Sequence, residues 1–285
     1  MKDLKGAGAI QVNYMLDQVL AQWANPWAAG VIGYAERLMD LPLGVVGVAF
    51  GTVLLPTFSG FFARNDEDGA RKALVSSVNS LLFVMIPAAV GLCILAPDTT
   101  RVIYEGGDFD AMATVRVSRA LAVYALGLGF FGFQKTMVPW FQAQNDMKTP
   151  LRVSVCTVCL NAALNVLAVF GLPVEWRHVG LAVSTVLCAA VGCALLVVFA
   201  RRRNGALGLA EELPTVGKMA LATLVMGAAV WLVRPLVGGW NAVLSLGVLV
   251  AVGGGAYALA SVVLHRGRLR VLLSRCSRPK KGFAA

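Results

Sequence analysis

The feature that most constrains this 285-residue chain is a series of eight long, continuous apolar stretches. A helix needs about 20 mostly apolar residues to cross a hydrocarbon layer about 30 Å thick. The stretches that meet or approach this length are residues 7–27, 29–62, 73–96, 117–141, 151–172, 179–200, 216–233 and 242–264. The sequence therefore predicts an all-α, polytopic membrane protein with about eight transmembrane helices.

The composition argues against a soluble enzyme. Hydrophobic residues make up 58% of the chain and charged residues only 14%, against about 45–50% and about 25% in ordinary soluble domains. The two histidines, His178 and His265, both lie at span ends, and no nucleophile, base or metal constellation can be named. We therefore predict that the chain is not an enzyme.

The basic residues predict the orientation of the chain. With eight spans both termini lie on one side of the membrane, and that side collects 18 of the 25 lysines and arginines, whereas the other side collects 5. The positive-inside rule therefore places both termini in the cytoplasm. This distribution also accounts for the net charge of +10 without a nucleic-acid partner, and we expect the basic tail to lie on anionic membrane lipids.

The second span contains charged residues, which cost at least ~2.5–3.5 kcal/mol each at the centre of a membrane. Arg37 lies between Glu36 and Asp40. One interpretation is an internal ion pair with Asp40, which lies one turn further along the helix. The other is an anion site, because a guanidinium offers several donors to phosphate oxygens in a fixed fork. Pro42 and Pro56 predict that this helix bends or breaks.

Two further polar features lie inside predicted spans. Lys135 falls in the fourth span, near the expected midplane of the membrane, where a structural ion pair and a contact with substrate are two open interpretations. A second group comprises Asn13, Asp17, Asn161, Asn165 and Thr185. If these residues meet, their oxygens suit a hard monovalent cation, but hydrogen bonding between helices is an alternative interpretation.

Several strings of the sequence resemble the MurJ/MviN family of lipid II flippases. Residues 34–45 (YAERLMDLPLGV) and 52–56 (TVLLP) are similar to the family's eighth transmembrane helix, and residues 11–13 (QVN) to its seventh. Residues 125–128 (ALGL), 135–139 (KTMVP) and 146–152 (DMKTPLR) resemble its tenth helix and the loop that follows. The resemblance covers nearly the whole chain and thins after about Glu211.

The resemblance implies the fold of the multidrug/oligosaccharidyl-lipid/polysaccharide exporters, in which two six-helix lobes face a central cavity and two additional helices follow. The chain would supply only the C-terminal portion. Residues 1–203 would form the second lobe, residues 204–265 the two appended helices and residues 266–285 a basic cytoplasmic tail. The first lobe would be a partner in the same chain or in a separate one.

The function that the resemblance implies is transport of lipid II, an undecaprenyl-pyrophosphoryl disaccharide-pentapeptide, from the inner to the outer leaflet of the bacterial cytoplasmic membrane by alternating access. Arg37, Glu36, Asp40 and Lys135 are the expected substrate-binding residues. The membrane potential would drive transport, since a charge gains about 2.3 kcal/mol per 100 mV. A sodium site would lie at Asp17, Asn161, Asn165 and Thr185, although Asn165 stands where a carboxylate is expected.

Other functions remain open on the sequence alone. The chain could belong to a flippase for another polyprenyl-linked glycan, to a drug exporter of the same superfamily, or to a non-transporting membrane scaffold. An intramembrane transferase is disfavoured, because it needs a catalytic constellation that the chain does not offer.

Overall fold

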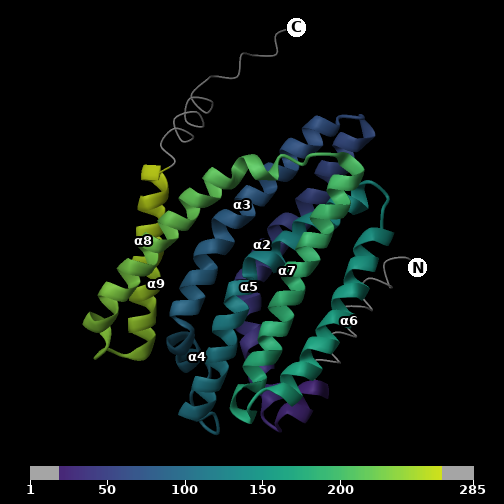
Figure 1. Ribbon diagram of the computed structural model, residues 1–285. Coiled ribbons are helices and arrows are strands. Elements are labelled where there is room, and N and C mark those ends of the chain that lie inside the picture. The colour runs from purple at the N-terminus through teal and green to yellow at the C-terminus, as the bar shows by residue number, and fades with distance from the viewer. Residues whose placement is uncertain (1–18, 265–285) are drawn as a thin grey trace.

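The computed structural model describes residues 19–264, apart from the side chains of residues 48 and 49. Within that range the chain forms helices and no strand (Figure 1). The long helices are α2 (Ala28–Ala63), α3 (Glu67–Ile94), α5 (Ala111–Ala143), α6 (Lys148–Gly171), α7 (Arg177–Asn204), α8 (Leu213–Val237) and α9 (Ala242–Leu264). The short elements are α4 (Ala96–Tyr104) and the 3₁₀ turns η1 (Val174–Trp176) and η2 (Leu209–Glu212).

The long helices confirm the predicted class of fold. All seven are long and apolar enough to cross a membrane, and they correspond to seven of the eight predicted spans. The remaining span, residues 7–27, lies mostly outside the described residues; of it, residues 19–24 are helical and lead through a short turn into α2. The part of the chain described by the structure is therefore an all-α bundle of membrane-spanning helices.

Acidic side chains mark where two of the helices begin. Asp66 accepts a hydrogen bond from the Gly69 amide (2.8 Å) at the start of α3. Asp110 accepts one from the Ala113 amide (2.7 Å) at the start of α5. Such caps satisfy amide groups that have no partner inside the helix. They also let α3 and α5 begin several residues before the apolar runs that predicted them.

The second span does not break at its prolines. α2 continues from Ala28 to Ala63 with Pro42 and Pro56 inside it, so the part of the prediction that expected a broken helix is wrong. Near the second proline, the Thr57 hydroxyl donates to the Val53 carbonyl at 2.6 Å. A long helix can tolerate proline within a membrane where nearby groups satisfy the backbone.

α5 lies at the centre of the bundle and packs against α2, α3 and α7 (Figure 1). Three of its large side chains, Tyr124, Trp140 and Phe141, are almost fully buried. The Trp140 ring makes an edge-to-face contact with Phe58 of α2, with 5.3 Å between centroids. These contacts fix the position of α2 relative to α5, which decides how the charged residues of the two helices are arranged.

The last two helices form a hairpin that packs against α3 and α4. The Tyr257 hydroxyl of α9 donates to the Phe83 carbonyl of α3 at 2.7 Å. Arg234 of α8 forms an ion pair with Asp98 of α4 at 2.8 Å. The boundaries of the lobe, the appended helices and the tail (1–203, 204–265 and 266–285) stay a prediction, although α7 ends at Asn204, close to the first of them.

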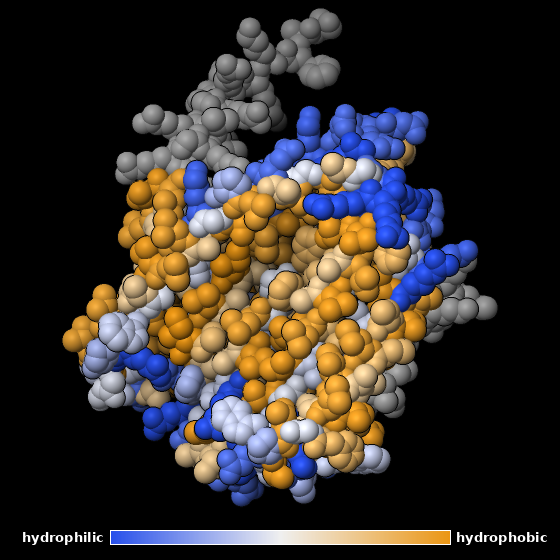
Figure 2. All heavy atoms as spheres, viewed as in Figure 1, coloured by the Kyte–Doolittle hydropathy of each residue, from blue (hydrophilic) through white to orange (hydrophobic). Residues whose placement is uncertain are grey.

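Three connections meet at one end of the bundle, which is drawn uppermost in Figure 1. Arg71 of α3 donates to the carbonyl of Asn204 at 2.7 Å. Arg203 of α7 forms an ion pair with Asp146, which precedes α6, at 2.9 Å. The basic residues near these three positions therefore share one end of the bundle. Figure 2 shows hydrophilic residues at both ends, with an apolar belt between them.

Candidate substrate-binding face

One face of α2 carries charged residues and glycines in a single stripe. Arg37, Asp40, Gly44 and Gly47 follow one another at intervals of three or four residues, which places them on the same side of a helix. Arg37, Asp40 and Gly44 are exposed, and a Cβ atom added to Gly44 would meet no atom within 4 Å. This face of α2 is therefore open in the described part of the chain.

Arg37 lies beside a group of aromatic rings. Its guanidinium carbon is 5.9 Å from the centroid of the Tyr34 ring, at the outer limit of a cation–π contact. The Tyr34 ring in turn packs against Tyr104 of α4, with 4.7 Å between centroids, and against Phe109, at 5.4 Å. Tyr34 and the loop around α4 therefore border the site on the side of Arg37.

Arg37 does not form the ion pair that one interpretation of the sequence offered. Among residues 19–264, no carboxylate oxygen lies within 4.0 Å of an Arg37 nitrogen, and that includes Asp40. A guanidinium in a membrane-spanning helix without an acidic partner favours the other interpretation, in which it attracts an anion.

Tyr104 adds a neutral hydrogen-bond donor near this position. Burial raises the pKa of its hydroxyl above the ordinary value, and the positive charge of Arg37 opposes only part of that rise. The hydroxyl therefore stays protonated at neutral pH, and it donates a hydrogen bond to the Tyr34 carbonyl at 3.5 Å.

Glu36 points toward the core of the bundle. It is half-buried, and its carboxylate accepts a hydrogen bond from the Tyr124 hydroxyl of α5 at 3.3 Å. Although Glu36 and Arg37 are adjacent in sequence, the structure thus gives them different surroundings. Glu36 is therefore engaged with a neighbouring helix by a hydrogen bond.

Lys135 reaches the α2 stripe from α5. Its Nζ would lie 3.2 Å from a Cβ atom added to Gly47, and its charge is close enough to Asp40 to interact electrostatically. Arg37 and Gly47 are ten residues apart on α2, or about 15 Å at 1.5 Å per residue. The structure therefore places the two predicted cations on one face at two depths, with Asp40 between them.

Sequence reasoning missed the residues that shape this face. Gly47 is needed because a side chain there would occupy the space of Lys135, and Tyr34, Tyr104 and Tyr124 contact the charged residues. Only Gly47 gave a signal, since it stands one helical repeat of seven residues after Asp40. The tyrosine contacts depend on helix packing.

The polar group predicted to hold sodium is partly assembled. Asn161 and Asn165 of α6 are both buried. The Asn165 amide donates to Asn161 Oδ1 at 2.9 Å, and the Asn161 amide donates to Thr185 Oγ1 of α7 at 3.4 Å. Asp17, the carboxylate of the predicted set, lies outside the described residues.

These contacts match the hydrogen-bonding interpretation between α6 and α7. The three side chains still offer oxygen atoms of the kind that a hard cation prefers. Within residues 19–264, no group of three His, Cys, Asp or Glu residues could hold a metal ion. The described residues therefore fit a cation only as neutral oxygen ligands.

Comparison with known proteins identifies relatives of the chain. Residues 3–251 match the sequence family described as "Lipid II flippase MurJ". A "Probable lipid II flippase MurJ" of Rhizobium tropici is 31% identical over 267 residues, which cover 90% of this chain and 49% of that protein. One from Rickettsia prowazekii is also 31% identical, over 70% of this chain and 38% of that protein. The chain thus spans about half or less of the length of these relatives.

Solved structures agree on the fold. A structure described as "Lipid II flippase MurJ, inward closed conformation" has a TM-score of 0.75 at 24% identity, and the match covers 92% of this chain and 52% of that one. A transporter of the MOP superfamily from Pyrococcus furiosus has a TM-score of 0.61 at 16% identity and covers 92% of this chain and 62% of its own. With a family match over most of its length, this chain belongs to the lipid II flippase MurJ family.

Proposed function

We propose that the chain forms the C-terminal part of a transporter that moves lipid II from the inner to the outer leaflet of the bacterial cytoplasmic membrane by alternating access. The observation that carries the proposal is Arg37, an exposed cation in a membrane-spanning helix without an acidic partner within 4.0 Å in residues 19–264. The pyrophosphate of lipid II needs such a cation, because an anion is strongly disfavoured in hydrocarbon.

The other residues of the face have complementary roles in the proposal. Lys135 of α5 provides a second cation, which reaches α2 about 15 Å further along that helix. The anion can therefore be held at two depths in the membrane. Asp40 lies between the two cations and limits how tightly the anion is held. Glu36, which accepts a hydrogen bond from Tyr124, positions Arg37 by anchoring α2 to α5.

The proposal includes a first lobe, in the same chain or in a separate one, that faces the stripe on α2. Two apolar residues beside the stripe, Leu41 and Val45, are 61% and 74% exposed. The chain also spans about half or less of the length of the two relatives described above. A lobe across from this face would enclose the cavity in which the headgroup crosses the membrane.

The surroundings of the transporter follow from the charge distribution. We propose that both termini of this chain lie in the cytoplasm, on the side of Arg71 and Arg203, because basic residues collect at that end. The membrane potential would act on the charges of the substrate and the cavity.

The proposal also includes a Na⁺ site, formed by Asn161, Asn165 and Thr185 together with Asp17. Binding there would couple the Na⁺ gradient to transport.

The decisive experiment replaces Arg37 in a complete transporter that carries this chain. We expect Arg37→Ala to abolish rescue of cells depleted of their own flippase, and Arg37→Lys to restore it only in part, since lysine cannot make the bidentate contact. Arg64→Ala is the matched control, because Arg64 lies at the end of the same helix, where it stacks on Phe61. Normal growth of the Arg37→Ala strain at wild-type expression would contradict the proposal.

A second measurement identifies the substrate. Lipid II exposed on the outer leaflet should fall when the transporter is depleted and recover with the wild-type protein. If growth recovers while the exposure of lipid II does not, the transporter moves another polyprenyl-linked glycan or a drug. If the purified chain binds neither lipid II nor any first lobe, it is a scaffold.

A further inference from the structure

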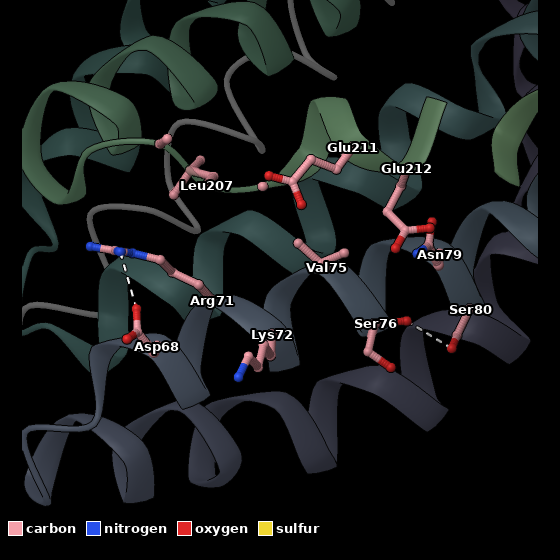
Figure 3. A pocket seen from close by; sticks show the side chains of 12 residues that line it. Asp68, Arg71, Lys72, Val75, Ser76, Asn79, Ser80, Leu207, Glu211 and Glu212 are labelled. Carbon is pink, nitrogen blue, oxygen red and sulfur yellow. Dashed lines mark hydrogen bonds and ion pairs between the residues drawn. The ribbon is translucent and has the colours of Figure 1, made fainter. Parts of the chain in front are cut away.

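A polar groove lies apart from the α2 stripe, between α3 and the segment that leads into α8 (Figure 3). Its volume is about 640 Å³, within the range of about 300–1,000 Å³ that is usual for small-molecule sites. Lys72, Ser76, Asn79 and Ser80 line the wall formed by α3, and Glu211 and Glu212 of η2 line the opposite wall. The groove is therefore lined by groups of both charges.

Buried contacts hold the second wall in place. Leu207 is 1% exposed and belongs to a core cluster with Leu74 and Trp140. Gly208 has a φ of +75°, in the left-handed region that glycine adopts readily, and lets the chain turn into η2. Arg71 closes one end by donating to the carbonyl of Asn204 at 2.7 Å. The groove is thus built into the fold by packing as well as by the turn.

Of the five charged residues that line the groove, two have no ion-pair partner in the described part of the chain. Arg71 forms ion pairs with Glu67 (3.1 Å) and Asp68 (3.3 Å). In contrast, neither Lys72 nor Glu211 has an ion-pair partner within 4.0 Å in residues 19–264. The groove therefore presents one cation from α3 and one carboxylate from η2 to a ligand.

The groove runs inward from the headgroup layer along α3. α3 has 28 residues and is about 42 Å long, which exceeds a hydrocarbon core of about 30 Å. The lining residues of α3 run from Asp68 to Ser80, over about the first half of the helix, and start at the end of the bundle where Arg71 meets Asn204. The next turn presents Phe83 and Val84, which are 39% and 45% exposed. A ligand with a polar head and an apolar tail matches this sequence of surfaces.

We propose that this groove binds the headgroup of an aminophospholipid such as phosphatidylethanolamine. The phosphate would lie on Lys72 and the Ser76 hydroxyl, and the primary ammonium on Glu211. A choline headgroup has no N–H to donate to the carboxylate, and a glycerol headgroup has no cation to pair with it. Glu211 therefore distinguishes the headgroup, whereas Lys72 holds any phosphate. The site is independent of lipid II and of Arg37.

The test is native mass spectrometry of the full chain with phosphatidylethanolamine, phosphatidylcholine or phosphatidylglycerol added in turn. We expect the first lipid to bind about five- to tenfold more tightly than the other two, as one charge-assisted hydrogen bond allows. Glu211→Gln should remove this preference, and Lys72→Ala should weaken binding of all three. Equal binding of the three lipids to the wild type would overturn the proposal.

Matched variants separate the groove from general effects of charge. Lys218→Ala removes an exposed cation of α8, and Glu175→Gln removes an exposed carboxylate of η1. Both variants should leave the preference for phosphatidylethanolamine unchanged. If either variant loses binding or preference as much as the groove variants do, only the net charge of the protein matters. Soluble phosphoethanolamine should compete poorly, because it lacks the tail that contacts Phe83 and Val84, and equal competition would refute binding as a lipid. Circular dichroism confirms that each variant is folded.

Discussion

Asp146 joins the loop between α5 and α6 to the end of α7, and its replacement by asparagine should weaken this connection by a small, defined amount. Asp146 Oδ1 accepts hydrogen bonds from the amides of Lys148 (3.1 Å) and Thr149 (3.0 Å). Oδ2 accepts from Thr149 Oγ1 at 2.7 Å and pairs with Arg203 at 2.9 Å. Asparagine can keep the first pair of contacts but loses the charge of the second.

The expected magnitudes follow from exposure. The side chains of Arg203 and Asp146 are 47% and 16% exposed, so solvent screens the pair and Asp146→Asn should cost only about 0.2–1 kcal/mol. Asp146→Ala also removes the helix cap, which adds about 0.5–2 kcal/mol. For a chain of this size, about 1 kcal/mol lowers Tm by roughly 2–4 °C. We therefore expect a clear order: wild type, Asp146→Asn, then Asp146→Ala.

The pH dependence tests the same contact. Burial alone would raise the pKa of Asp146, but the hydrogen bonds from Thr149, the charge of Arg203 and the Lys148 amide together lower it below the ordinary value of 3.8. A carboxylate with a lowered pKa contributes stability above its unfolded pKa, and this contribution is lost as the pH falls through the folded pKa. The difference in Tm between wild type and Asp146→Asn should therefore shrink below about pH 4.

The assay is thermal unfolding in detergent, with a double-mutant cycle between Asp146→Asn and Arg203→Gln. A coupling energy of about 0.2–1 kcal/mol would support a direct interaction of the two charges. If Asp146→Asn destabilises the protein as much as Asp146→Ala, or if the coupling is zero, the ion pair does not contribute and the reasoning is refuted.

Three further predictions concern the site, the hairpin and the cation. Gly47→Val should displace the ammonium of Lys135, which lies 3.2 Å from the new Cβ; the variant should reduce rescue of flippase-depleted cells as much as Lys135→Ala, and the double variant should be no worse. Tyr257→Phe removes a 2.7 Å hydrogen bond to the Phe83 carbonyl and should cost about 0.6–1.7 kcal/mol, seen as faster hydrogen exchange in α9; unchanged exchange would contradict it. Na⁺ should raise the Tm of the wild type, and Asn161→Ala should abolish this rise; if Na⁺ does not change the Tm of the wild type, the cation site is disproved.

The helices could be predicted from sequence because each satisfies its own backbone hydrogen bonds within the membrane. Their ends were harder to predict. α3 begins at Glu67 rather than near residue 73 and α5 at Ala111 rather than near residue 117, since Asp66 and Asp110 cap polar turns that precede the apolar runs. Hydropathy detects the part of a helix in hydrocarbon and misses the part that extends into the headgroup layer.

The site was predictable only in part. Arg37 and Lys135 stood out because cations are rare within apolar spans. The contact of Lys135 with Gly47 joins residues 88 positions apart, and it depends on how α5 is rotated against α2. No pattern within one helix carries that information. For the same reason, the sequence left both interpretations of Arg37 open, and the structure favoured one by showing Asp40 out of reach.

The stripe on α2 also has a consequence for how the protein is made. Asp40 leaves the ribosome about a hundred residues before Lys135, an interval of about 5–20 s at ordinary rates of synthesis. During that time α2 enters the membrane without α5, which later supplies both Lys135 and the Tyr124 hydroxyl that donates to Glu36. The insertion machinery must therefore hold a helix with three charged residues until its neighbour emerges, and the apolar residues around the stripe are what keep α2 in the bilayer until then.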